Sequence, residues 1–116
     1  MVYCVVIKGS SVPNAPGRPR ILKVIDKEVT LNWTQPDGDG GAEITGYVIS
    51  YTSPDERLAH RVTVAVTTTA KLTKFVRERY YVFAVAAKNA VGSGAFSPFS
   101  EEVKIPNFRG NILCFP

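Results

Sequence analysis

Apolar and polar residues alternate with a period of two through most of the chain, and turn-forming residues interrupt the alternation at short intervals. This pattern predicts β-strands, because successive side chains of a strand point to opposite faces of a sheet. The predicted strands span residues 20–25, 28–34, 44–52, 60–66, 67–75, 80–88 and 96–105. Short strands separated by turns predict an all-β fold, a seven-strand antiparallel sandwich of two packed sheets.

The inward-facing positions of these strands are rich in large aromatic residues, which suits the space between two sheets. Trp33, the only tryptophan of the chain, supplies a large central side chain. The predicted structural core consists of Trp33, Tyr47, Tyr51, Tyr81, Phe83 and Val85.

The stretch "YYVFAVAAK" (80–88) is apolar on both of its faces. If Tyr81, Phe83 and Val85 face the core, the alternate positions face outward, where a solvated sheet should be polar. An exposed apolar patch is typical of a contact surface. We therefore predict a protein-binding sheet face, with the alternative that small β-formers are simply tolerated there. Its residues are Val48, Tyr80, Val82, Ala84 and Ala86.

The chain has 116 residues and a formal net charge of +4, which fits one mildly basic domain. Lysines and arginines are scattered, so the expected partners are other proteins or neighbouring domains, and not nucleic acid. No apolar run is long enough for membrane insertion. One basic group could make a weak polyanion contact, although a solvated turn is the preferred interpretation; it consists of Lys71, Lys74, Arg77 and Arg79.

Candidate chemistry is sparse. The only histidine, His60, has no nucleophile motif to accompany it, and "DGDGG" (37–41) lacks the later ligands of a calcium loop. We therefore expect no enzyme activity, no cofactor and no metal. Asn32 begins "NWT", an N-glycosylation acceptor pattern that matters only in the secretory pathway.

Several motifs together resemble the fibronectin type III family. They are "VTLNW" (29–33), "PDGDGGAEITGYVISY" (36–51) and "YVFAVAAKNAVGSG" (81–94), preceded by a pair of prolines at 16 and 19. The resemblance implies an immunoglobulin-like sandwich with Trp33 between the sheets. It also implies that Tyr81 is the tyrosine-corner residue, with its hydroxyl bonded to backbone a few residues upstream.

Two segments need separate interpretation. Phe75 stands where the family usually has leucine, and "VRER" (76–79) replaces its Pro-Gly-type turn, so the geometry of this turn is open. "FSPFS" (96–100) resembles the W-S-x-W-S signature of cytokine receptors. Because the neighbouring strand offers no outward arginines, we interpret Phe96 and Phe99 as ordinary core and rim packing.

The resemblance covers about residues 16–106, preceded by a β-prone piece and a Pro/Gly linker (1–15) and followed by a tail (107–116). It implies a non-catalytic interaction or spacer module of a larger protein of sarcomeric or cell-adhesion type. The sarcomere or cytoskeleton is expected in preference to an extracellular location, with Cys4 and Cys114 as free thiols. The alternatives are a ligand-binding receptor ectodomain and an accessory module of an extracellular enzyme.

Overall fold

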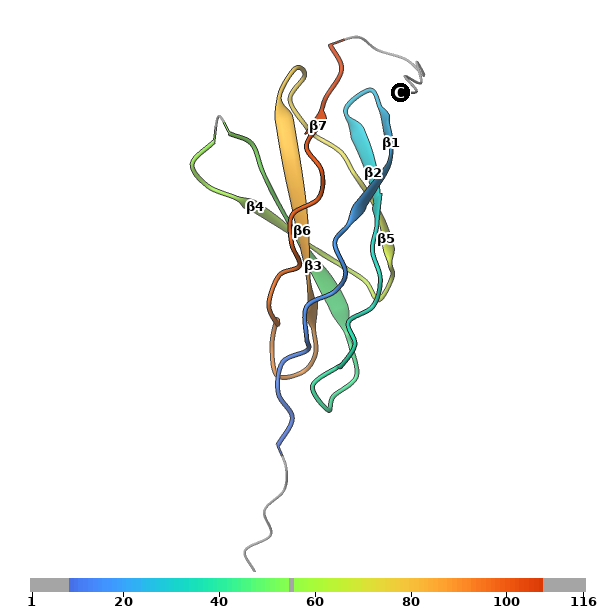
Figure 1. Ribbon diagram of the computed structural model, residues 1–116, viewed down its shortest axis with the longest axis vertical. Helices are drawn as coiled ribbons and strands as arrows, with labels where there is room; N and C mark the ends of the chain where they lie inside the picture. The colour runs from blue at the N-terminus through green and yellow to red at the C-terminus, as the bar shows by residue number, and fades with distance from the viewer. Residues whose placement is uncertain (1–8, 55, 108–116) are drawn as a thin grey trace, which may run out of the picture.

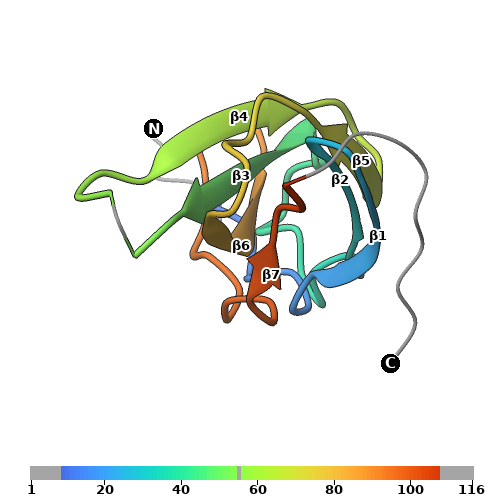
Figure 2. The same ribbon diagram turned by 90° about the horizontal axis from the view of Figure 1, so that it is seen from above.

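The computed structural model describes residues 9–54 and 56–107. Its strands are β1 (Arg20–Ile25), β2 (Glu28–Asn32), β3 (Gly46–Thr52), β4 (His60–Val64), β5 (Thr69–Leu72), β6 (Tyr80–Lys88) and β7 (Val103–Lys104). They form a three-stranded sheet, β1-β2-β5, and a four-stranded sheet, β4-β3-β6-β7, with every pairing antiparallel. The two layers face each other in Figures 1 and 2. The predicted seven-strand sandwich is confirmed. The described residues contain no helix, and so no helical membrane span.

The core lies between the sheets and follows the period-two pattern. Val29 and Leu31 of β2 are fully buried and face Ile49, Phe83 and Val85 of the other layer. Trp33 is 5% exposed and meets the ring of Tyr47 edge-on, with 5.4 Å between the ring centroids. Of the predicted core residues, Trp33, Tyr47, Tyr81, Phe83 and Val85 are buried and Tyr51 is partly buried.

The tyrosine corner implied by the resemblance is present. The backbone N–H of Val76 donates a hydrogen bond to the hydroxyl of Tyr81 at 3.1 Å, and the ring of Tyr81 packs on buried Phe75. The "VRER" segment still makes a tight turn, because the N–H of Arg79 donates to the carbonyl of Val76. Glu78 takes the left-handed backbone position of this turn, with φ of 68°, where glycine is the usual residue.

The predicted last strand differs from the observed one: only Val103–Lys104 is regular strand, although residues 96–105 were expected. The segment before it, residues 94–102, also runs along the edge of β6, but it contacts β6 at every third residue instead of every second. Gly94, Ser97, Ser100 and Val103, at every third position, meet Ala87, Val85, Phe83 and Tyr81, at every second position. The hydroxyls of Ser97 and Ser100 accept hydrogen bonds from the N–H groups of Val85 and Phe83. Side-chain oxygens thus replace the carbonyls of a regular ladder.

The ends of the described chain lie at opposite ends of the molecule. In Figure 1 the described chain begins, in blue, near the lower end and finishes, in orange-red, near the upper end. The expectations for the flanks, including the β-prone piece at 1–8, the tail after residue 107, and Cys4 and Cys114, fall outside the described residues.

Candidate functional site

The outer face of the β4-β3-β6-β7 sheet carries the predicted protein-binding residues. Cross-strand register places Val48 beside Ala86, Ser50 beside Ala84, and Thr52 beside Val82. Arg61 and Thr63 of β4 extend these rows, since Arg61 pairs with Ser50 and Thr63 with Val48. Because the alternate residues of each strand point into the core, these side chains share one outward face.

This outer face is partly covered. Ala84 is 2% exposed and Ala86 is 0% exposed, whereas an open sheet face would expose both. The guanidinium of Arg61 lies over the ring of Phe96, 5.1 Å from its centroid. Arg61 stands in the row Arg61–Ser50–Ala84, and Phe96 directly precedes Ser97, which is bonded to Val85 of β6. From these positions we infer that the ring and the guanidinium together cover the small residues of β3 and β6.

Two expectations about this face therefore need correction. Ala84 and Ala86 do not form an exposed surface, because they are almost completely buried. We attribute this burial to the stacked pair of Arg61 and Phe96. Phe96 is not ordinary core packing, because its ring pairs with a cation on the outer face. An arginine does meet the "FSPFS" segment, but it comes from β4, which β3 and β6 separate from β7. Inspection of the neighbouring strand alone could not reveal it.

We expect Phe96→Ala to lower the free energy of unfolding by about 1–2 kcal/mol, because it exposes Ala84 and Ala86 and removes a cation–π contact. Phe99→Ala is the matched control. Phe99 is 54% exposed in the same motif, so its loss should cost less than about 0.5 kcal/mol. Urea denaturation of both variants measures the difference. Equal costs would show that Phe96 does not cover the sheet.

The remaining outward positions stay accessible. Tyr80 is 43% exposed, and the ammonium of Lys104 lies 5.6 Å from the centroid of its ring. Val48 and Val82 are half-buried. The outer face therefore presents two aromatic rings, each with a cation stacked on it, on either side of a few small apolar side chains.

A second feature is the N-terminal segment, residues 10–14, which lies between the loops 35–43 and 89–94 at the lower end of the molecule (Figure 1). The N–H of Ser11 donates to the carbonyl of Gly40 at 2.8 Å, and the N–H of Asn14 donates to that of Gly38 at 3.0 Å. Pro13 is buried. The segment is thus hydrogen-bonded to the sandwich like a short additional strand.

Asn89 joins this segment to both loops. Its side-chain amide nitrogen donates to the carbonyls of Ser11 and Asp39, each at 2.8 Å. Its side-chain oxygen accepts hydrogen bonds from the N–H groups of Val91 and Gly92. Asn89 is only 5% exposed, so one nearly buried side chain holds three separate stretches of chain together.

Two glycines allow the N-terminal segment to come this close. A Cβ atom at Gly94 would lie 2.0 Å from the carbonyl oxygen of Pro13. A Cβ atom at Gly40 would lie 2.1 Å from that of Ser11, and Gly40 has φ of 78°. Both positions therefore require glycine while residues 11–13 are in place.

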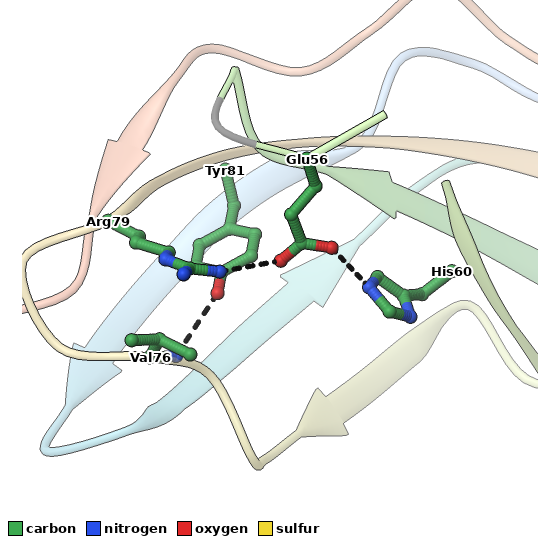
Figure 3. Close-up of polar contacts among 5 residues, drawn as sticks. All are labelled: Glu56, His60, Val76, Arg79 and Tyr81. Carbon is green, nitrogen blue, oxygen red and sulfur yellow. Dashed lines mark hydrogen bonds and ion pairs between the residues drawn. The ribbon is translucent and has the colours of Figure 1, made fainter. Parts of the chain in front are cut away.

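A polar cluster lies at the other end of the sandwich, near the tyrosine corner (Figure 3). Glu56 accepts a hydrogen bond from Arg79 at 3.0 Å and contacts the ring nitrogen of His60. The ring of His60 stacks on Tyr51 with 5.1 Å between centroids. The bond to His60, and next the nearby charges of His60 and Arg79, hold the pKa of Glu56 below its ordinary value of 4.5.

Because the pKa of Glu56 is lowered in the folded chain, this group makes the protein less stable as the pH falls. The unfolded chain protonates Glu56 at a higher pH than the folded chain does, so the cluster adds stability above pH 4.5 and loses it as the pH falls through the folded pKa. We expect Glu56→Gln to make the decline of stability below pH 4.5 less steep. His60→Gln should act in the same direction. Thermal unfolding between pH 3 and pH 7 measures both variants, and an unchanged acid slope would contradict the assignment.

The other sequence-predicted residues lie apart. Asn32 is half-buried on the outer face of the β1-β2-β5 sheet, between Arg20 and Thr69. Three residues of the basic group pair with carboxylates: Lys71 with Glu28, Arg77 with Asp26, and Arg79 with Glu56. Asp37 and Asp39 belong to the loop that contacts the N-terminal segment, and Asp39 accepts from the N–H of Gly41 within a tight turn.

The family model described as "Fibronectin type III domain" matches residues 14–103. The chain belongs to the fibronectin type III family. The module is 32% identical to titin of Drosophila melanogaster over 93 residues, covering 80% of this chain and, to the nearest per cent, 0% of that protein. It is 36% identical to the protein sax-3 of Caenorhabditis elegans over 87 residues, covering 73% of this chain and 7% of sax-3.

Solved structures agree with this assignment. A crystal structure of domains A168-A170 from titin superposes with a TM-score of 0.79 and 28% sequence identity, covering 84% of this chain and 34% of that one. This fibronectin type III module thus spans a small part of the length of its curated relatives. It is a structural or interaction module of the kind from which large multidomain proteins are built.

Proposed function

We propose that this chain serves as a non-catalytic, in-line spacer of a larger protein, which holds its neighbours at a fixed distance and orientation and offers one sheet face to other proteins. The observation that carries the proposal is the N-terminal segment. Chain that enters at residue 9 is fixed at once to two loops, and chain that leaves at residue 107 does so at the opposite end. A spacer needs this arrangement, because a free linker would act as a hinge.

A sarcomeric or cytoskeletal parent is proposed in preference to a cell-adhesion receptor. Titin-like proteins occur among both the sequence relatives and the structural matches, which supports the first choice. The relative sax-3 supports the second. The adhesion type would place Asn32 in the secretory pathway, where its acceptor pattern could be glycosylated. A receptor ectodomain and an accessory module of an extracellular enzyme are the remaining alternatives.

We also propose that the working unit begins at residue 10 and ends near residue 106. Residues 10–14 are bonded to the loops 35–43 and 89–94, so a domain cut at residue 16 would lose contacts that fix those loops.

For protein binding, the accessible positions of the proposed binding face are Val48, Tyr80 and Val82. Ala84 and Ala86 serve as the floor beneath Arg61 and Phe96.

Single-molecule stretching tests the spacer function. The chain has two cysteines, Cys4 and Cys114, one near each end, so handles can be attached without mutation. We expect one cooperative unfolding event with a length gain of roughly 30 nm. The N-terminal segment should remain attached until the sandwich opens. Extension of this segment at low force, before the main event, would contradict the proposal, because the module would then be joined by a free linker.

A further inference from the structure

We propose that the outer face of the β4-β3-β6-β7 sheet binds an extended, acidic segment of a partner protein through Arg61 and Lys104. This inference deepens the proposed function and rests on its interaction half. The spacer half stands on different residues, at the N-terminal end of the module.

The charged residues within the strands of the β4-β3-β6-β7 sheet are all basic. Strands β3, β4, β6 and β7 contain no aspartate or glutamate, and they carry Arg61, Lys88 and Lys104. The other sheet includes Glu28, which pairs with Lys71. An acidic partner therefore meets no like charge from the strands of the four-stranded sheet. The acidic residues next to these strands in sequence include Glu101 and Glu102, which are exposed on the segment directly before β7.

Among the described residues, the two cations stacked on rings have no acidic partner of their own. Within the part of the chain that the structure describes, Lys71, Arg77 and Arg79 pair with carboxylates, whereas Arg61 and Lys104 contact aromatic rings. A ring face orients a cation without using its N–H donors for hydrogen bonds to oxygen. Arg61 and Lys104 are both exposed, so these donors remain available to carboxylates from outside.

The shape of the face favours an extended segment. The outward row between the two cations consists of Thr52 and Val82, which are small and half-buried, and Phe99, 54% exposed, lies on the adjoining segment. A strand-like chain alternates its side chains between two sides, and one that alternates acidic with apolar residues could use both kinds of contact. The expected partner is therefore a protein segment in which aspartate or glutamate alternates with valine or tyrosine.

The experiment is an NMR titration of the full 116-residue chain with a capped ten-residue peptide that alternates glutamate with valine and tyrosine. A peptide with glutamine at every glutamate position is the neutral probe. We expect shifts in β3, β4, β6 and residues 94–104, weaker binding at higher salt, and little response to the neutral probe. Arg61→Gln/Lys104→Gln should weaken binding by about tenfold, since each exposed pair is worth up to about fivefold.

Lys23→Gln/Lys71→Gln is the matched control, because it removes two charges from the outer face of the other sheet. It should leave the affinity unchanged. If the double variant is unstable, Lys104→Gln alone replaces it in the titration. Lys104 lies at the end of the edge strand β7, so this substitution should not disturb the fold. The proposal is overturned if the double variant binds like wild type, or if no shifts occur at millimolar peptide. It is also overturned if a heparin hexasaccharide binds through Lys23 and Lys71 while the peptide does not bind. None of these outcomes would alter the stretching behaviour that tests the spacer function.

Discussion

Trp33→Ala is expected to lower the free energy of unfolding by about 3–5 kcal/mol, the largest effect of any single change considered. Trp33 is 5% exposed between the sheets and packs edge-on against Tyr47. Removing it leaves a cavity that the paired strands on either side cannot close. Because it is the only tryptophan, urea unfolding should be followed by circular dichroism and not by fluorescence.

The control for this variant is Leu58→Ala. Leu58 is 79% exposed, so its truncation should cost less than about 0.5 kcal/mol. Trp33→Phe should fall between the two and serves if Trp33→Ala does not fold, since typical domains have only 5–15 kcal/mol of stability. A cost below about 1 kcal/mol for Trp33→Ala would mean that Trp33 is not the centre of the core.

Asn89→Ala has the second largest expected effect, about 2–4 kcal/mol. The nearly buried side chain makes four hydrogen bonds, each with a net contribution of about 0.5–1.5 kcal/mol, and its loss leaves the carbonyls of Ser11 and Asp39 without this donor. The N-terminal segment should also detach. Thermal unfolding measures the first effect, and faster hydrogen exchange of the Ser11 amide measures the second.

Asn14→Ala is the matched control for Asn89→Ala. Asn14 is exposed, and the contact that fixes it comes from its backbone N–H, which the substitution retains. Stability and Ser11 exchange should therefore stay near wild type. If Asn89→Ala behaves like this control, the segment is held by its backbone bonds alone, and Asn89 only shapes its own loop.

Strand positions could be predicted well where two conditions coincide: period-two alternation and a clear turn at each end. Residues 20–25 and 80–88 satisfy both, and the observed β1 and β6 have these bounds. Strands predicted from alternation alone were too long. Residues 67–75, for example, contain a strand only at Thr69–Leu72, because Lys74 adopts a left-handed backbone and begins the turn before the tyrosine corner.

The irregular edge of β6 could not be derived from alternation. The segment 94–103 matches every third of its residues to every second residue of β6, with Ser97 and Ser100 providing acceptors that a regular strand takes from its backbone. Two serines three residues apart do not by themselves predict this irregular edge from a sequence. Its meaning depends on a neighbouring strand whose register is known only in three dimensions.

The candidate surfaces were predictable in part, for a similar reason. Alternation identified which residues of β6 point outward, but not what covers them, because Arg61 and Phe96 belong to segments separated by two strands of the sheet. The proline and glycine before residue 16 indicated a linker within residues 1–15. Proline content does not reveal whether a linker is free, and the residue that fixes this one, Asn89, is 78 positions away from Ser11.

The central claim is that the N-terminal segment belongs to the folded module and makes its lower end stiff. Backbone ¹⁵N relaxation of residues 10–14 in the wild-type chain tests it most directly. We predict order parameters near 0.85 for Ser11 and Asn14, equal to those of β3, and a drop toward 0.6 in Asn89→Ala. Values below about 0.6 in the wild type would show a flexible linker on the nanosecond timescale and would contradict the account of this module as a fixed spacer.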